Sequence, residues 1–166
     1  EHFASIRPAE TQQPARDLNR TNIVSLASLR NADQTAYGAK AANLGELGRI
    51  LDDAMVPDGV AVPFAMYDQF MTETGFYQIA EDMLASASFR NDPDRRHARQ
   101  PLLRAEIEGG VVSESILKRL DAAYADLKLQ FGESTSFRVR SSTNNEDLVG
   151  FTGAGLYDSK THRPTE

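Results

Sequence analysis

Two short segments that lie far apart in the chain place the strongest constraints on its fold. Residues 38–47 begin with Gly38 and Lys40 and continue with leucines at helical spacing. Residues 137–148 start with alternating apolar and basic side chains, the pattern of a β-strand, and continue into a polar loop after Arg140. Each segment therefore sets a cation beside backbone that starts a helix or leaves a strand. This arrangement suits a chain of phosphates, because N–H groups and positive charges can both face the anions.

The remaining pattern predicts an α+β fold that is rich in helices and contains a small mixed sheet. Short apolar or alternating runs indicate strands at residues 23–26, 60–62 and 136–140. Helical spacing of apolar residues, bounded by glycine, proline or serine, predicts about five helices. These helices span residues 40–51, 63–74, 76–87, 93–108 and 114–131. Residues 1–20 are polar, contain two prolines and lack periodicity, so we expect a linker or a disordered N-terminal segment there.

The composition argues against several classes of function. The formal charge is −6, from 18 basic and 24 acidic side chains, which disfavours general nucleic-acid binding. The chain has no cysteine, so disulfides, zinc–thiolate sites and cysteine nucleophiles are excluded. His2, His97 and His162 lie far apart in polar stretches, and we expect solvated side chains rather than a metal cluster. The basic run at 95–99 has acidic neighbours and no interleaved aromatic residues, so we expect a solvated helix face.

The length and the ends of the chain bear on its organisation. Its 166 residues suit one domain or a large part of one. No apolar run approaches the roughly 20 residues of a membrane span, and no signal peptide is visible. The chain begins with Glu1 and ends in the polar stretch 160–166, so we interpret it as a piece of a larger protein. The absence of cysteine suits a cytoplasmic location.

Arg140 has two interpretations on spacing alone. It follows a predicted strand, and ligands gather beyond the carboxyl ends of strands in open α/β sheets. Its guanidinium is a planar fork of donors that fits phosphate oxygens. A salt bridge to Glu146 or Asp147 explains the same residue equally well. We expect those two carboxylates to be solvated or to cap backbone N–H groups, rather than to bind magnesium or to act as an acid–base pair.

The glycine-rich stretch 150–155 is a second candidate for phosphate contact. Its glycines permit the φ values that let backbone N–H groups close over phosphates. The stretch does not have the Gly-Lys-Ser/Thr ending of a Walker A loop, nor the spacing of a dinucleotide-binding loop. A simple hairpin turn would explain the same residues.

Together, these segments resemble the nucleotide-binding domain of the pyruvate phosphate dikinase and phosphoenolpyruvate synthase family, which includes glucan water dikinases and rifampicin phosphotransferases. The family pattern Gly-Gly-Lys-x-x-x-Leu-Gly-Glu is similar to residues 38–46, although Ala39 replaces its second glycine. A Val-Pro-x-Gly stretch with a following strand and helix resembles residues 56–71. The Val-Arg-Ser-Ser motif with its acidic pair and glycine loop resembles residues 139–155. The resemblance spans roughly residues 22–158.

The resemblance implies specific roles for residues of this chain. The family domain is of the ATP-grasp type, so we expect residues 21–166 to be the N-terminal part of such a domain. Lys40 and Arg140 match the cations that contact the ATP phosphates, and Ser141, next to Arg140, is expected to contact the phosphates as well. Gly153 and Gly155 match the loop that lies over the phosphates. A methyl group at position 39, where backbone approaches phosphate, is expected to weaken binding or to shift the loop.

The resemblance also implies what this chain does not contain. The magnesium ligands of the family lie in the second half of the nucleotide domain, so we assign no metal ligand and no catalytic residue here. The phosphorylated histidine and the pyruvate site lie on other domains, and none of the three histidines of this chain has the matching context. We therefore expect the piece alone to be inactive, with ATP and the other domains of the same chain as its partners.

Three functions remain open at the level of sequence. The first is the ATP-binding portion of an enzyme that passes a phosphoryl group from ATP, through a carrier histidine, to pyruvate. The second is a related phosphotransferase with another acceptor, a glucan or the antibiotic rifampicin. The third is a module that kept the fold without catalysis, which Ala39 favours and the intact Lys40 and Arg140 oppose.

Overall fold

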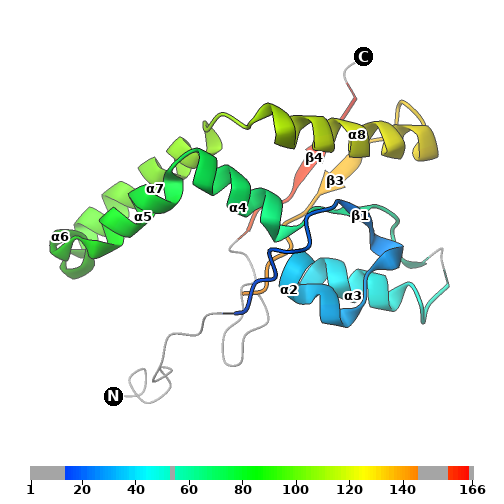
Figure 1. Cartoon of the computed structure of the whole chain (residues 1–166), viewed down its shortest axis with the longest axis horizontal. Coiled ribbons are helices and arrows are strands. Elements are labelled where there is room, and N and C mark those ends of the chain that lie inside the picture. The colour runs from blue at the N-terminus through cyan, green and yellow to red at the C-terminus, as the bar shows by residue number, and fades with distance from the viewer. Residues whose placement is uncertain (1–13, 53–54, 146–156, 165–166) are drawn as a thin grey trace. The chain divides into compact units, whose positions relative to one another are not determined.

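A computed structural model describes residues 14–52, 55–145 and 157–164 of the chain (Figure 1). The chain divides into two compact units. The first unit is discontinuous and combines Glu1–Ala65 with Ala123–Glu166, and the second is the intervening segment Met66–Ala122. Both predicted phosphate-binding segments belong to the first unit.

Short helices dominate the N-terminal half of the first unit. Two 3-10 turns, η1 at Leu26–Ser28 and η2 at Asn31–Asp33, lead into helix α2 at Gln34–Tyr37. Helix α3 follows at Ala39–Leu47, after the single residue Gly38. The predicted helix at 40–51 is confirmed at its start but ends earlier, because a succession of turns replaces the helix from Gly48 onward.

The strands of the first unit form two antiparallel pairs. Strand β1, Val24–Ser25, pairs with β2, Val60–Ala61, and strand β3, Phe137–Val139, pairs with β4, Lys160–His162. The α+β, helix-rich class is confirmed, and all three predicted strands are present in shortened form. They are divided between two sheets rather than joined in one mixed sheet. Strand β4 was not predicted, because Lys-Thr-His carries no apolar alternation and forms a strand through its pairing with β3.

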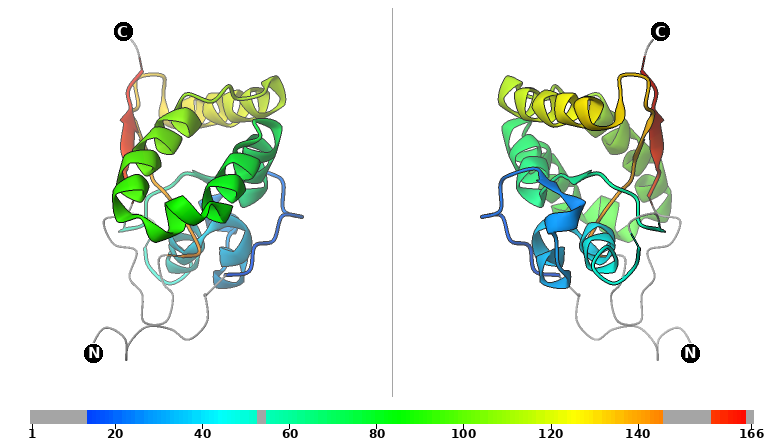
Figure 2. Two further views of the ribbon diagram at one scale, coloured as in Figure 1. Left: turned by 90° about the vertical axis from the view of Figure 1, so that its left-hand side faces the viewer. Right: turned by 90° about the vertical axis from the view of Figure 1, so that its right-hand side faces the viewer.

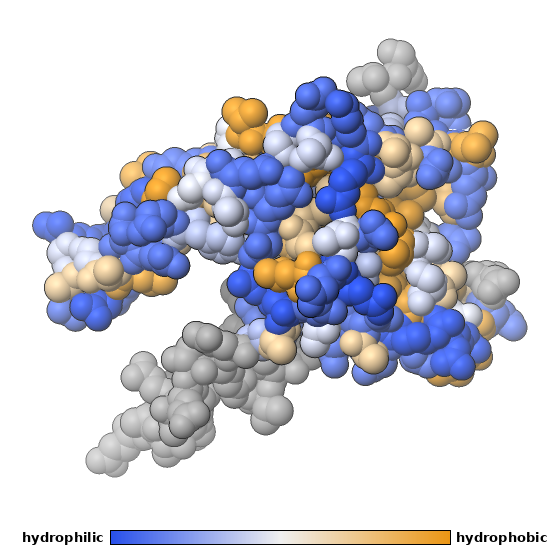
Figure 3. Space-filling view, viewed as in Figure 1, coloured by the Kyte–Doolittle hydropathy of each residue, from blue (hydrophilic) through white to orange (hydrophobic). Residues whose placement is uncertain are grey.

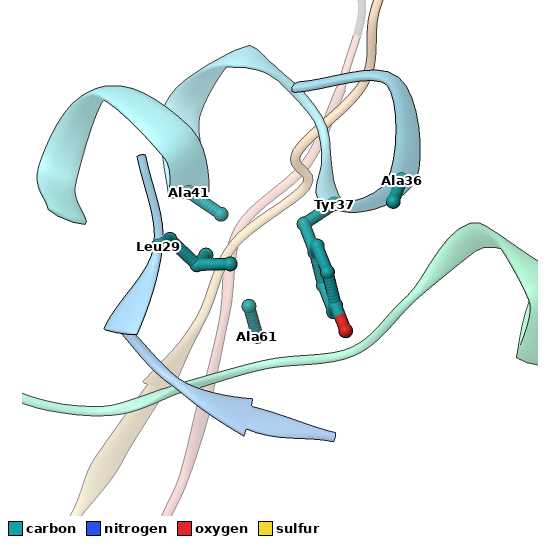
Figure 4. Close-up of a cluster of buried hydrophobic side chains, with 5 residues drawn as sticks. All are labelled: Leu29, Ala36, Tyr37, Ala41 and Ala61. Atoms are coloured by element: carbon teal, nitrogen blue, oxygen red, sulfur yellow. The ribbon is translucent and has the colours of Figure 1, made fainter. Parts of the chain in front are cut away.

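Small side chains allow α2, α3 and the β1–β2 pair to pack closely. Five buried residues form the hydrophobic cluster drawn in Figure 4: Leu29, Ala36, Tyr37, Ala41 and Ala61. In that view Leu29, Tyr37, Ala41 and Ala61 face a common centre. Three of the five members are alanines, so backbones approach each other where larger side chains would hold them apart. This cluster supports the start of α3, which carries Lys40.

The burial of the Tyr37 phenol predicts that this cluster loses stability at alkaline pH. Tyr37 is 3% exposed, and its hydroxyl donates a hydrogen bond of 2.9 Å to the carbonyl of Asn22. Burial raises the pKa of the Tyr37 phenol above its ordinary value of 10.0, because the phenolate would lose its hydration. The stability contributed by this group is therefore complete below about pH 10 and is lost as the pH rises through the folded-state pKa.

We expect Tyr37→Phe to remove that part of the alkaline loss. The variant loses the hydrogen bond to Asn22 and should be about 1 kcal/mol less stable at neutral pH. Denaturant unfolding of both proteins at several values between about pH 8 and about pH 11 measures the difference. An equally steep alkaline decline in Tyr37→Phe and in the unsubstituted chain would show that another group causes it.

The second unit is built from helices. Helix α4 spans Phe64–Glu73, α5 Phe76–Ala85, α6 Ala87–Asn91, α7 Pro93–Glu108 and α8 Glu114–Phe131, so that α4 and α8 also contribute residues to the first unit. The helices of this region are the green and yellow-green ribbons of Figure 2, with short α6 joining α5 to α7. The predicted helices at 63–74, 76–87, 93–108 and 114–131 are confirmed with small shifts at their ends. Helix α6 was missed, although Ser86 at its start accepts a hydrogen bond from the N–H of Phe89 as an N-cap.

The boundaries of these helices follow from local chemistry. Gly75 adopts a left-handed φ of 73° between α4 and α5. The Asp92 carboxylate accepts hydrogen bonds from the N–H groups of Asp94 and Arg95, and Pro93 occupies the first turn of α7. Buried side chains hold the helices together: Met66, Met71, Phe76, Phe89, Leu103 and Ile116.

The surface of the described residues is largely polar. Figure 3 shows one face on which hydrophilic residues predominate and hydrophobic residues occur in separate groups. The most exposed large apolar side chains include Leu129 and Val111, at 87% and 85%. Within the described ranges, no helix combines the length and the apolar character needed to cross a membrane.

Candidate phosphate-binding site

The loop that leaves β3 is hydrogen-bonded to the start of α3. The N–H of Ala39 donates to the carbonyl of Thr143 at 3.0 Å, and the N–H of Ala41 donates to the hydroxyl oxygen of Ser142 at 3.0 Å. The second bond joins residues that are 101 positions apart in the chain. The structure therefore brings together the two segments that the sequence singled out, and it joins them by one backbone hydrogen bond and one bond to a serine side chain.

Gly38 makes this close approach possible. It has a φ of 84° and a ψ of 159°, a conformation essentially restricted to glycine. A Cβ atom at this position would lie 2.3 Å from both the carbonyl carbon and the carbonyl oxygen of Ser142. The glycine that opens the first motif thus allows the second motif to pack directly against it.

The same hydrogen bonds limit how the helix start can meet an anion. The N–H groups of Ala39 and Ala41 belong to the first turn of α3, where helices commonly present N–H groups to phosphates. In this protein both are already used by Thr143 and Ser142. An anion near this helix start would therefore be held mainly by side chains, and the two cations become the main candidates.

Lys40 and Arg140 lie on the two sides of this junction. Lys40 is half-buried in the first turn of α3, between the two bonded N–H groups. Arg140 is exposed and directly follows β3, two residues before Ser142, while Ser141 between them is half-buried. An extended chain advances about 3.3–3.6 Å per residue, so Arg140 starts within about 7 Å of the Ser142 backbone. The backbones of both residues therefore lie near the junction.

Several predicted residues lie outside the described ranges. Gly153 and Gly155 fall in the segment 146–156, as do Glu146 and Asp147, the proposed salt-bridge partners of Arg140. The two interpretations of Arg140 and the role of the glycine loop remain predictions.

The departure from the family pattern at Ala39 has a structural explanation. Ala39 is only 4% exposed, so its methyl group packs inside the protein. Its N–H points to the Thr143 carbonyl. The methyl group therefore lies away from the surface that a ligand would approach from solvent.

The later part of the first motif anchors α3. The carboxylate of Glu46 accepts a hydrogen bond from the N–H of Asn31, and the side chain of Asn31 donates to Asn43. Gly45 faces η1 so closely that a Cβ atom there would lie 2.5 Å from the carbonyl oxygen of Leu26. The sequence indicated this stretch as helical and as a family signature, and the structure shows that it also fixes α3 on η1 and η2.

His97, His162 and the basic run at 95–99 lie at the surface, as expected from the sequence. His162 is exposed and its Nε2 lies 2.9 Å from the hydroxyl of Tyr124, while His97 is exposed on α7. Arg99 makes two hydrogen bonds to Glu106, and Arg95 pairs with Asp92. No group of three or more His, Asp or Glu residues within the described ranges could hold a metal ion.

The motifs that carry Lys40 and Arg140 meet at the start of α3, and cations of these two types suit the phosphate-binding class of domains. Comparison with known proteins makes that class specific. Residues 34–163 match the family described as the pyruvate phosphate dikinase AMP/ATP-binding domain, and the chain belongs to this family. It is an ATP-binding domain of the kind found in phosphoenolpyruvate-related phosphotransferases.

The curated relatives fall into two groups. The chain is 32% identical over 138 residues to a probable phosphoenolpyruvate synthase of Methanothermobacter thermautotrophicus, and 31% identical over 137 residues to one of Archaeoglobus fulgidus. It is 28% identical over 142 residues to a rifampicin phosphotransferase of Bacillus subtilis. Each match covers 82% of this chain but only 20%, 18% and 15% of these relatives, respectively. The chain thus spans about a fifth or less of their length.

Proposed function

We propose that this chain is the ATP-binding portion of a larger phosphotransferase that moves a phosphoryl group from ATP to a histidine on another domain and then to pyruvate. The observation that carries the proposal is the junction of α3 with residues 142–143, because it joins the motif that contains Lys40 to the motif that contains Arg140. Membership of an AMP/ATP-binding domain family supports ATP as the ligand. Two relatives named probable phosphoenolpyruvate synthases support pyruvate as the acceptor.

The two cations suit the electrostatic work of phosphoryl transfer. Such transfer depends mainly on positioning and on neutralising charge that spreads over phosphate oxygens. Lys40 supplies a compact ammonium, and Arg140 supplies a planar fork that can bind two oxygens at once. Ser141 adds a hydroxyl donor next to Arg140, and Gly153 and Gly155 would supply backbone N–H groups. With a net charge of −6 over the chain, this local pair of cations gives a nucleotide a distinct place to bind.

Magnesium is expected to accompany ATP in this reaction, and we place its ligands outside the described residues. Bound magnesium neutralises phosphate charge during transfer. Residues 14–52, 55–145 and 157–164 offer no cluster of acidic or histidine side chains for it. The work proposed for this chain is therefore to bind and orient the phosphates through Lys40 and Arg140.

A second acceptor is supported by a specific observation. Rifampicin phosphotransferases of Bacillus subtilis and Bacillus cereus are 28% and 32% identical to this chain, close to the values for the probable phosphoenolpyruvate synthases. The ATP-binding portion can be shared by enzymes with different acceptors, because the acceptor is bound elsewhere in the protein. Rifampicin is accordingly our second candidate acceptor.

Phosphorus NMR of the full-length protein with MgATP tests both candidates. We expect AMP to accumulate and phosphoenolpyruvate to appear only when pyruvate is added. Phosphorylated rifampicin instead of phosphoenolpyruvate, in a parallel sample with the antibiotic, would favour the second acceptor. ATP that stays intact in every sample would overturn the phosphotransferase proposal and favour a module without catalysis.

We expect Lys40→Ala and Arg140→Ala each to weaken ATP binding by about tenfold to a hundredfold, the range for losing one charged hydrogen-bonding group. Neither residue is fully buried, so the thermal midpoint should change little. Arg138→Ala is the matched control, because Arg138 lies within β3, two residues before Arg140, and its guanidinium donates to the Thr161 hydroxyl at 2.8 Å. Calorimetric titration of the three variants with ATP measures the effect. Equal affinities in Arg140→Ala and Arg138→Ala would remove Arg140 from the site.

A further inference from the structure

We propose that Ser142 is a positioning residue, which sets Lys40 and Arg140 at the spacing that the phosphates of ATP require. The proposal rests on the proposed function and extends it to a residue that the sequence did not single out. Ser142 contacts the first motif at two points: its hydroxyl oxygen accepts the Ala41 N–H at 3.0 Å, and its carbonyl group packs against Gly38. Neither contact involves a group that would itself need to touch ATP.

The hydrogen bonds made by residues 142 and 143 lie on both sides of Lys40 in the sequence. The N–H groups on both sides of it, from Ala39 and Ala41, are bonded to Thr143 and Ser142. The backbone that carries the lysine is therefore fixed relative to the 142–143 segment by two hydrogen bonds. A shift of that segment would move both ends of the lysine-bearing turn.

The same segment fixes Arg140 from the other side. Arg140 lies two residues before Ser142, and strand β3 ends immediately before it, at Val139. The arginine is thus held between a strand paired with β4 and a serine bonded to α3. The backbone segments that carry the two cations are therefore joined through this junction. We infer that the junction sets the distance between these two segments.

Fixed spacing matters because phosphoryl transfer depends on geometry. Misplacing a reacting group by about 1 Å can lower a rate by about a hundredfold. Loss of the Ser142 hydroxyl leaves the N–H of Ala41 without its partner and releases one of the two hydrogen bonds that hold the turn. The expected consequence is a larger fall in kcat than rise in the KM for ATP, because the two cations would still bind the phosphates but at a less favourable spacing.

The test compares Ser142→Ala, Ser142→Thr and Ser86→Ala in the full-length enzyme, by the rate of AMP formation at varied ATP. Ser86→Ala is the matched control, because it also removes a serine cap, that of α6 in the other compact unit. We expect about a tenfold or greater fall in kcat for Ser142→Ala, recovery of most of the rate in Ser142→Thr, which keeps a hydroxyl, and an unchanged kcat in Ser86→Ala. Combining Ser142→Ala with Lys40→Ala should add little further loss, because both act on the same phosphates.

The outcomes separate this inference from the proposed function. An unsubstituted enzyme that consumes ATP, together with a Ser142→Ala variant of equal kcat, overturns the positioning role alone. A fall in kcat that Ser86→Ala shares, or that Ser142→Thr does not relieve, identifies a general loss of stability and also overturns it. An unsubstituted enzyme that leaves ATP intact overturns the proposed function, and the positioning role with it.

Discussion

Replacing Gly38 by alanine is expected to destabilise the first unit by about 3 kcal/mol or more, the largest effect of any single substitution considered for this chain. Two costs add together. An alanine at a φ of 84° and a ψ of 159° is strained by its own backbone conformation. Its Cβ would also lie 2.3 Å from backbone atoms of Ser142, which cannot move aside as a flexible side chain can. Denaturant-induced unfolding followed by circular dichroism measures the loss.

Gly75→Ala is a comparison in which the steric cost is absent and the backbone cost is smaller, because Gly75 has a ψ of 10° and lies in the left-handed helical region. Gly75 has a comparable φ of 73°, but a Cβ atom there would meet nothing within 4 Å. It should therefore lose only about 1 kcal/mol, the cost of the left-handed conformation. If the two variants lost equal stability, the close approach of Gly38 to Ser142 would not contribute, and the junction would be looser than described.

Replacing Gly45 by alanine is expected to cost about 2 kcal/mol, although helix propensity alone favours alanine over glycine by about 1 kcal/mol. The reason is packing. A Cβ at Gly45 would lie 2.5 Å from the carbonyl oxygen of Leu26 and 2.6 Å from that of Leu29, so α3 and η1 would have to separate. Thermal unfolding of the variant should show a lower midpoint.

Gly48→Ala is the matched control for this prediction. Gly48 follows Gly45 by one turn, has a φ of −62°, and its added Cβ would find no atom nearer than 3.6 Å. Alanine should be neutral or stabilising there by up to about 1 kcal/mol. A stabilised Gly45→Ala variant would contradict the close packing of α3 on η1.

The helices could be predicted from the sequence because their signals are local. Gly38 precedes α3, Asp92 and Pro93 start α7, and Gly75 separates α4 from α5, each through the conformation or hydrogen bonds of its own neighbourhood. The pairing of the strands was harder to predict from the sequence than the helices were. Strands of two or three residues carry too few alternating positions to specify their partners, and β4 depends on β3 for its existence.

The sequence indicated the two motifs but not the contact between them. The roles of Lys40 and Arg140 were inferred from the chemistry of their motifs and remain predictions. The bond from Ala41 to Ser142 could not be foreseen, because a serine in a polar loop gives no sign of which distant N–H it will accept. The same bond shows that the first N–H groups of α3 serve the fold, which sequence reasoning had considered available to phosphate.

The discontinuity of the first unit has a consequence for how the chain folds during synthesis. Met66–Ala122 is contiguous, so all of its residues have left the ribosome before the first unit is complete. The partners that close the start of α3, Ser142 and Thr143, are made only afterwards. A nascent chain halted ahead of them contains Gly38 and Lys40 but has nothing to bond Ala39 and Ala41. The lysine-bearing turn is therefore assembled late, by closure of a long loop around an inserted unit.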